Sequence, residues 1–230
     1  MSLAVVHSRA QLGMEAPPVT VEVHLANGLP NLSIVGLPET AVKESKDRVR
    51  AALQNARFEF PAKRITINLA PADLPKEGGR FDLPIAIGIL AASGQVSTRE
   101  LDKYEFIGEL ALTGKLRSVL GALTVALQTR QTGRALILPA VNALEAALAG
   151  GADIRAAKHL LEVTAHLNGE KLLARQEPEM QRSESAETPD LRDIRGQHQA
   201  RRALEIAAAG GHSLLMIGPP GAGKTMLASR

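Results

Sequence analysis

Strict alternation of apolar and polar residues predicts two β-strands in this chain. In Val19–Leu25 and in Ile65–Leu69 every second residue is aliphatic, the pattern of a strand with one face on a core. A third strand is predicted between them, at 31–35. The short apolar run 135–138, which ends before Pro139, predicts a fourth. Residues 106–119 have the pattern of a hairpin that turns at Thr113 and Gly114.

Apolar residues at helical spacing predict the helices. In 39–56, Val42, Val49 and Leu53 share one stripe, while Lys43 and Lys46 lie on the remaining faces with Arg50. Further helical patterns cover 83–92, 120–132, 141–149 and 159–167. Together with the strands they predict an α+β or α/β domain over residues 1–168.

The pattern changes after residue 168. Glu, Gln, Arg and Ser dominate from 170 to 189 and no periodicity survives, so we predict a linker over 169–189. Order resumes at Asp190. A helix is predicted over 200–209, ended by Gly210 and Gly211, which places the start of a second domain, 190–230, at this point.

The second domain carries a glycine-rich motif that fits the phosphate-loop pattern. The motif consists of Gly218, Pro219, Pro220, Gly221, Ala222, Gly223, Lys224 and Thr225. Its glycines let successive N–H groups face the phosphates of ATP, Lys224 reaches the β- and γ-phosphates, and the Thr225 hydroxyl holds Mg²⁺. An apolar run at 212–217 predicts the preceding strand, and a helix is expected from Lys224. The alternative is a plain glycine turn between strand and helix.

Only five residues follow this loop. We therefore expect the chain to be the N-terminal part of a longer ATPase that ends just after its first motif. Hydrolysis needs further groups that orient water and stabilise charge. We predict that residues 1–230 bind nucleotide weakly and do not turn it over.

Composition excludes several classes of protein. The 230 residues are 45% hydrophobic, enough for one core and part of a second, and no apolar run approaches the ~20 residues of a membrane span. The N-terminus lacks the pattern of a secretory signal, so we expect a cytoplasmic protein without a membrane partner. There are no cysteines and the six histidines are scattered, which argues against disulfides and zinc sites.

Positive residues in the first domain suggest a surface for a phosphate backbone. The candidates for DNA contact are Lys43, Lys46, Arg50, Lys63, Arg64 and Arg80, with Arg48 and Lys76 nearby in sequence. The net charge of +3 is too small to support this alone. Acidic residues are interleaved, so a solvated helix face with i, i+4 pairs is the alternative. Aromatic content is 2%, so stacking on bases would contribute little.

Three carboxylates bracket the loop around residue 77. Asp73, Glu77 and Asp82 could form a pair for acid–base chemistry or a cation site. Helix capping and solvation of the loop are the alternative interpretation, and the one we favour from sequence.

Several blocks resemble known families. Residues 193–197, the following helix, 209–215 and the phosphate loop resemble the opening of AAA+ modules of the magnesium-chelatase clade, where the first block corresponds to the adenine-side pocket. Residues 2–4, 32–38 and 68–76 resemble the ComM/YifB proteins, which are magnesium-chelatase-like. The resemblance covers essentially the whole chain.

The ComM/YifB resemblance implies a first domain with the fold of the Lon proteolytic domain, the ribosomal-protein-S5-domain-2-like fold. Lon activity needs a serine after a Pro-Lys-Asp-Gly-Pro block and a lysine after a Gly-Gly-Leu block. The matching blocks here, 75–80 and 121–124, place Arg80 and Thr124 at those two positions. Nucleophilic catalysis needs both a hydroxyl and its base, so we predict that this domain cleaves no peptide.

The same resemblance implies an ATP-dependent motor that works as a homo-hexameric ring and remodels DNA, by helicase or branch-migration activity, during DNA uptake and recombination. One alternative is a chelatase-type motor that inserts a metal into a cofactor. Another is that the first domain is a protein-interaction module that recruits or regulates the motor.

Overall fold

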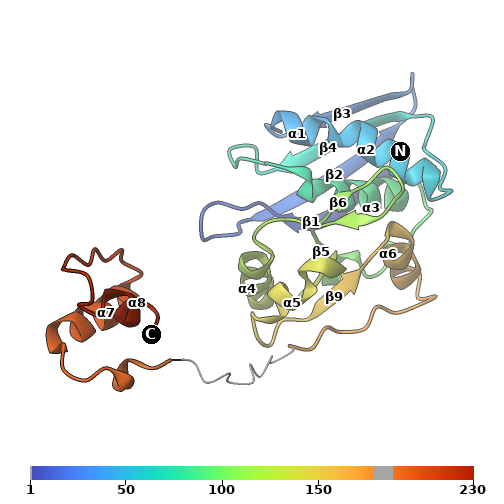
Figure 1. Cartoon of the computed structure of the whole chain (residues 1–230). Coiled ribbons are helices and arrows are strands. Elements are labelled where there is room, and N and C mark those ends of the chain that lie inside the picture. The colour runs from blue at the N-terminus through green and yellow to red at the C-terminus, as the bar shows by residue number, and fades with distance from the viewer. Residues whose placement is uncertain (1, 179–188) are drawn as a thin grey trace. The chain divides into compact units, whose positions relative to one another are not determined.

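The chain divides into two compact units, Met1–Glu179 and Met180–Arg230. The computed structural model describes residues 2–178 and 189–230, and Figure 1 shows it with its helices and strands. Within these residues all β-strands belong to the first unit, and the second contains only helical elements and loops.

A seven-stranded mixed sheet is the framework of the first unit. Across the sheet the order is β3-β4-β2-β1-β5-β8-β9. β2 pairs antiparallel with β1 and with β4, and the other neighbours run parallel. The strands are β1 (Ser2–Arg9), β2 (Pro18–Ala26), β3 (Asn31–Val35), β4 (Arg64–Ala70), β5 (Tyr104–Phe106), β8 (Ala135–Pro139) and β9 (Ile154–Ala157). This mixture of sheet and helix confirms the predicted α+β class.

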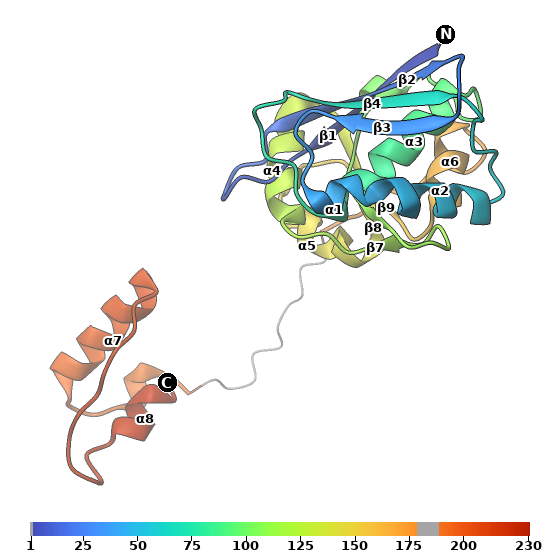
Figure 2. The same cartoon turned by 90° about the horizontal axis from the view of Figure 1, so that it is seen from above.

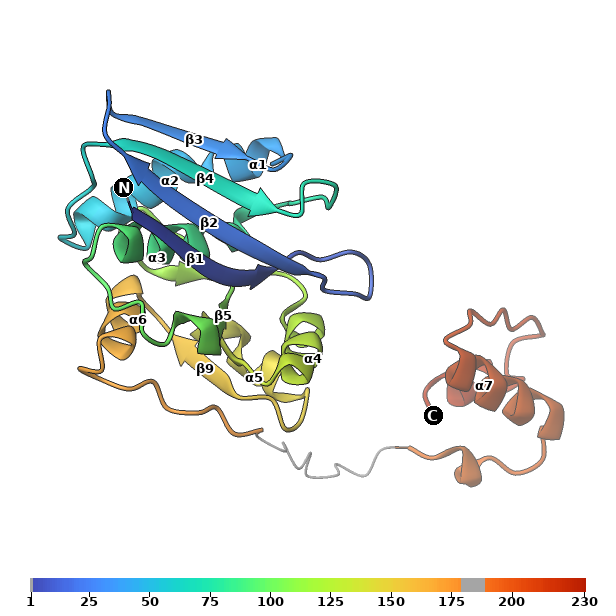
Figure 3. The ribbon, with the colours of Figure 1, turned by 180° about the vertical axis from the view of Figure 1, so that it is seen from behind.

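Three helices lie on one side of strands β1 to β4: α1 (Thr40–Lys43), α2 (Ser45–Asn55) and α3 (Asp82–Ala92). Figure 2 shows them beneath these strands, and in Figure 3 the same strands lie in front of them. Every residue of α3 is buried. A Cβ at Gly88 would lie 2.5 Å from Val23 Cγ2, so this glycine allows α3 to pack directly on β2.

Helices α4 (Ala122–Thr132), α5 (Ala143–Ala147) and α6 (Leu160–Leu167) belong to the half of the unit that contains β8 and β9. Leu136, Leu138 and Ile154 form a second buried cluster with the inner faces of α4 and α5. The predicted hairpin is present as β6 (Glu109–Leu110) and β7 (Leu116–Arg117). It turns at Gly114, whose φ of +86° lies in the region that favours glycine.

Several elements differ from the sequence prediction. The helix expected over 39–56 is divided into α1 and α2 at Glu44, although Val42, Val49 and Leu53 form the predicted buried stripe. Strands β1, β5 and β9 carried no recognised pattern. β5 and β9 are too short to show a period of two.

The first unit extends past the predicted boundary at 168. The N–H of Leu173 donates to His166 Nδ1 at 3.1 Å, and that of Gln176 donates to the carbonyl of Ile154 at 2.8 Å. Residues 169–178, predicted as linker, therefore attach to the first unit. The rest of the predicted linker, 179–188, lies outside the described residues.

The second unit consists of a short 3-10 helix η4 (Leu191–Asp193), α7 (His198–Gly210) and α8 (Lys224–Ala228). Asp190 caps η4, because its side chain accepts from the N–H of Arg192 at 2.9 Å. Gly211 ends α7 with a φ of +62°, the expected left-handed C-cap.

Candidate functional site

The phosphate-loop motif forms a turn that leads directly into α8. Gly221 and Gly223 have φ angles of +82° and +81°, which favour glycine. Gly223 is the N-cap of α8, and the N–H of Ala222 donates to the carbonyl of Pro219 at 3.3 Å. The glycine positions of the motif therefore coincide with the backbone conformations that the turn requires.

The ammonium of Lys224 lies over this turn. Its Nζ donates to the carbonyls of Gly218 and Pro219 at 2.8 and 2.9 Å. Within the described residues it has no carboxylate partner. Neutral acceptors of this kind can be exchanged for phosphate oxygens, which bind an ammonium more strongly. The residues thus fit ATP, with the exposed Thr225 hydroxyl next in the chain to serve as a ligand of Mg²⁺.

The strand predicted at 212–217 is absent, so that prediction is wrong for this structure. The segment has no regular secondary structure, and Leu215 and Ile217 are 81% and 87% exposed. A strand needs a neighbour for its N–H and C=O groups. The described part of the second unit contains no other strand to supply one.

The block that resembles the adenine-side pocket lies next to the end of α8. Ile194 in this block is 2% exposed. Arg230 Nε lies 3.5 Å from Asp193 Oδ2. The structure therefore brings the block at 193–197 together with the helix that follows the phosphate loop.

The first protease-like block lines a cavity of about 500 Å³ together with residues 118–120, which precede the second block. Arg80, at the position of the nucleophile, is 8% exposed. Its NH2 nitrogen donates to the carbonyl of Leu120, beside the second block, at 3.1 Å, and to Gln11 Oε1 at 2.8 Å. Thr124 does not line the cavity, and neither does any lysine or histidine. The cavity thus contains neither the lysine of the Lon pattern nor a histidine; its hydroxyl is that of Ser118, and its carboxylates are those of Glu77 and Glu109.

Five of the candidate DNA-contact residues come from α1, α2 and the start of β4. Arg50 stacks on Phe60, with its guanidinium carbon 4.6 Å from the ring centroid. Lys63 and Arg64, at the start of β4, are exposed. Lys46 lies one helical turn before Arg50 on α2, and Lys43 is the last residue of α1. No carboxylate in the described residues pairs with any of these five cations.

Arg80, the sixth candidate, is not available to DNA, because it is buried and its guanidinium donates to Gln11 inside the fold. Two neighbours considered with the set are also internal. Arg48 binds the carboxylate of Asp82, and Lys76 is fully buried. A phosphate backbone reaches only cations at the surface, so the structure reduces the basic surface to the exposed Lys43, Arg50, Lys63 and Arg64 and the half-buried Lys46.

Asp82 does not solvate the loop, and it is not part of a carboxylate pair. It is fully buried and accepts hydrogen bonds from Ser45 and Arg48, and from the N–H of Leu110 at 3.2 Å. Burial raises the pKa of its carboxyl group, and the hydrogen bonds from Arg48 and Ser45 oppose this only in part. Its place within helix α3 gave no sequence signal for this role. Within the described residues no three His, Cys, Asp or Glu side chains gather as a metal site.

Comparison with known proteins agrees with this geometry. The family described as "Subunit ChlI of Mg-chelatase" matches residues 21–142, and "Magnesium chelatase, subunit ChlI" matches residues 190–230. YifB of Salmonella typhimurium is 58% identical over 230 residues, all of this chain and 45% of the relative. Competence protein ComM of Haemophilus influenzae is 56% identical over 234 residues, all of this chain and 46% of the relative.

Lon protease 2 of Thermus thermophilus is 31% identical over 133 residues, 53% of this chain and 16% of that protein. Fold and sequence define the class: a Lon-like domain followed by part of an AAA+ module. The chain belongs to the magnesium-chelatase subunit ChlI family and, within it, to the ComM/YifB group. All of this chain matches YifB and ComM, but it spans only about half of their length. Among its described residues no helix is both long and apolar enough to cross a bilayer.

Proposed function

We propose that this chain supplies the phosphate loop of an ATP-driven motor that remodels DNA. The observation that supports it best is the turn at 218–223, where, among the residues that the structure describes, the Lys224 ammonium is held by the carbonyls of Gly218 and Pro219 alone. In a phosphate loop these neutral contacts would be replaced by β- and γ-phosphate oxygens. Thr225 would add its hydroxyl to Mg²⁺.

Bound ATP would supply the free energy of phosphoryl transfer. The residues of this chain would hold its phosphates and screen their charge. A group that orients the attacking water and an arginine near the γ-phosphate are also required, and the described residues around the loop include no group in either position. We therefore expect the 230-residue chain to bind ATP without sustained turnover. We also expect the motor to be a homo-hexameric ring in the cytoplasm.

DNA as the substrate rests on two observations. One relative carries the name of a competence protein. The exposed cations Arg50, Lys63 and Arg64 have no carboxylate partner in the part of the chain that the structure describes. Unpaired cations on one surface are suited to contact phosphates without reading sequence.

A chelatase-type motor is the second candidate, because both family descriptions name magnesium chelatase. It is less favoured, since the described residues gather no metal-ligand cluster. In the third candidate, the first unit recruits a protein partner.

Nucleotide binding and DNA-dependent hydrolysis test the proposal separately. For the 230-residue chain, titration with a fluorescent ATP analogue and Mg²⁺ should show saturable binding that Lys224→Ala removes. Lys171→Ala, an exposed lysine of the first unit, is the control. For the full-length protein, ATP hydrolysis with single-stranded, duplex and branched DNA should rise above the rate without DNA. If hydrolysis is unchanged by every DNA but rises with a metal and a tetrapyrrole, the chelatase candidate is correct.

A further inference from the structure

The cavity lined by the first protease-like block and by residues 118–120 has the size of a ligand site. Its volume of about 500 Å³ lies within the range of small-ligand pockets. Gln11 and Leu12 line it from the loop between β1 and β2, Gly79 and Arg80 from the 3-10 helix η1 (Gly79–Phe81), and Leu120 from the loop before α4. Segments from three distant parts of the first unit therefore meet here.

Arg80 places a positive charge without a counter-ion in the wall of this cavity. The residue is 8% exposed, and its hydrogen bonds go only to neutral acceptors, Gln11 Oε1 and the carbonyl of Leu120. The buried NH1 nitrogen has no partner in the described residues. Burial lowers the pKa of the Arg80 guanidinium, and the charge of Glu77 offsets this only partly.

An arginine keeps its proton even when buried. A buried charge without a counter-ion is strongly unfavourable, whereas a hydrogen-bonded carboxylate beside it removes much of that penalty. The wall of the cavity is therefore complementary to an anion. Gln11 is half-buried on a loop whose tip is exposed, so its amide is the contact that an incoming anion would replace.

The surroundings of the cavity restrict what the anion can belong to. Leu12 and Leu120 line it while remaining 52% and 83% exposed, so apolar surface stands at the opening. Glu77 and Glu109 also line it. Two carboxylates repel a phosphate or another polyanion more strongly than a single carboxylate. Apolar surface around one buried cation suits a peptide better than a nucleotide.

We propose that this cavity binds a peptide segment that carries one carboxylate between apolar side chains. The carboxylate pairs with the Arg80 guanidinium in place of the Gln11 amide, and the apolar side chains cover Leu12 and Leu120. No bond is made or broken. This site lies within the first unit and is independent of ATP and DNA binding.

Titration of the ¹⁵N-labelled 230-residue chain tests the proposal. The probe is the peptide acetyl-Leu-Asp-Leu-amide, and the matched control is acetyl-Leu-Asn-Leu-amide. We expect saturable shifts of the Gly78 and Gly79 amide signals with the aspartate peptide, and an affinity for the asparagine peptide about tenfold lower, because a charged acceptor is replaced by a neutral one. Inorganic phosphate should produce no saturable shift. The proposal is overturned if the aspartate peptide does not saturate, if the two peptides bind equally, or if phosphate binds more tightly.

Two substitutions assign the binding to this cavity. Arg80→Lys keeps the charge but loses the planar fork that pairs with a carboxylate. It should lower the affinity for the aspartate peptide several-fold. Leu120→Ser changes an exposed side chain, so it should leave the fold intact. It should also lower the affinity for the aspartate peptide. Leu148→Ser is the matched control, since Leu148 is 68% exposed and does not line the cavity. If both Arg80→Lys and Leu120→Ser bind the aspartate peptide with wild-type affinity, the site is refuted.

Discussion

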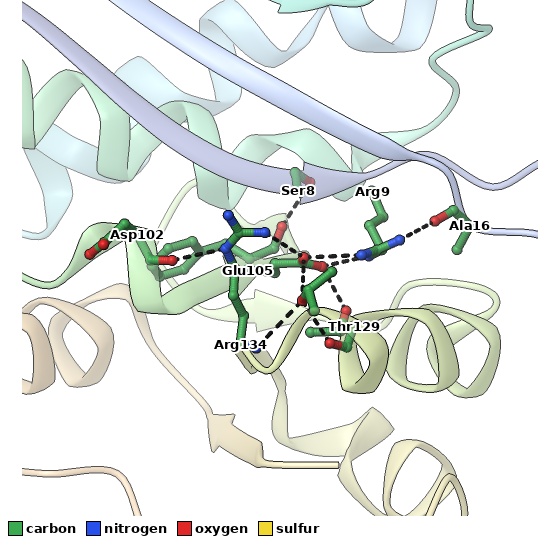
Figure 4. Close-up of polar contacts among 9 residues, drawn as sticks. Ser8, Arg9, Ala16, Asp102, Glu105, Thr129 and Arg134 are labelled. Carbon is green, nitrogen blue, oxygen red and sulfur yellow. Dashed lines mark hydrogen bonds and ion pairs between the residues drawn. The ribbon is translucent and has the colours of Figure 1, made fainter.

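The guanidinium of Arg9 and the carboxylate of Glu105 form a buried two-point ion pair between the neighbouring strands β1 and β5. Arg9 Nε donates to Glu105 Oε2 at 2.5 Å, and NH2 donates to Oε1 at 3.1 Å. Thr129 of α4 donates to the same carboxylate at 2.7 Å. Figure 4 shows these contacts, with Arg134 on the other side of Glu105. The cluster links β1 at the N-terminus to β5 and α4, about a hundred residues later.

Glu105→Gln should destabilise the first unit by about 3–5 kcal/mol, because it leaves the buried Arg9 charge without a counter-ion. Burial alone would raise the pKa of Glu105, but the hydrogen bonds from Arg9 and Thr129 outweigh it and hold the pKa below 4.5. The native state then binds fewer protons than the unfolded state as the pH falls below 4.5, so stability present above this pH is lost.

Chemical unfolding between pH 7 and pH 3 measures both effects. The wild type should lose more unfolding free energy over this range than Glu105→Gln. Glu100→Gln is the control, since Glu100 forms an exposed pair with Lys103 and should change little. Equal stability of Glu105→Gln and the wild type at pH 7 would show that the pair contributes nothing net.

His166 should make the attachment of residues 169–178 depend on pH. Its Nδ1 accepts from the N–H of Leu173, so the neutral ring carries its proton on the buried Nε2. Burial lowers the pKa of His166 below 6.5, and Arg155 lowers it further, against Asp153 and Glu100. As pH falls below 6.5 the unfolded state takes up the proton first, so stability decreases.

Amide exchange measures this attachment directly. The protection factor of the Leu173 amide should fall as the pH is lowered from 7.5 to 5.5. His166→Asn supplies an acceptor near Nδ1 without a titrating ring, so its protection should stay constant over the same range. A parallel fall in both proteins would assign the pH dependence to another group.

Lys76 should make the stability of the first unit depend on pH in the alkaline range. It is fully buried, and its Nζ donates to the carbonyls of Gly36, at 2.9 Å, and Pro71. Burial lowers the pKa of Lys76 below 10.5, with Asp73 opposing. Between the lowered pKa and 10.5 the unfolded state holds more protons, so the unfolding free energy should rise with pH. Lys76→Met should lack this part of the rise when urea unfolding is compared between pH 8 and pH 10.5, whereas the control Lys158→Met should keep it.

The sequence predicted those parts of the fold that have a local period. Val19 to Leu25 alternate cleanly, and Val42, Val49 and Leu53 form a helical stripe, so the strand and the buried face of the helix were both predicted. β1 was not predicted because Ser8 and Arg9 interrupt its apolar pattern, yet both are buried. Their burial depends on Phe106 and Glu105, which are almost a hundred positions away.

The same distinction applies to the candidate sites. The glycines of the phosphate loop and Lys224 could be identified from spacing, because the chemistry lies within eight consecutive residues. Arg80 was predicted to lie on an exposed surface, because the sequence shows its positive charge but not the residues that it contacts. Gln11 and Leu120 reach it only through the sheet topology.

The last prediction concerns the basic surface of the first unit, which consists of Lys43, Lys46, Arg50, Lys63 and Arg64. Replacing Arg50, Lys63 and Arg64 with Ala in the full-length protein should weaken DNA binding across sequences. It should also flatten the plot of log affinity against log salt by about one unit for each phosphate that the variant no longer neutralises. Lys43→Ala with Lys46→Ala should also weaken binding, and because Lys46 and Arg50 are i, i+4 neighbours on α2, the effects of the two sets should couple rather than add.

The matched control carries the same reduction in charge elsewhere: Lys103, Lys115 and Lys158, all exposed, replaced with Ala. The comparison needs ring assembly to be intact in each variant, as measured by light scattering. A control that weakens binding as much as the Arg50 set would show that net charge alone determines affinity. Unchanged affinity and salt slope in both the Arg50 set and the Lys43 and Lys46 set would place the DNA contacts outside this basic surface, and α2 would then present an ordinary solvated face.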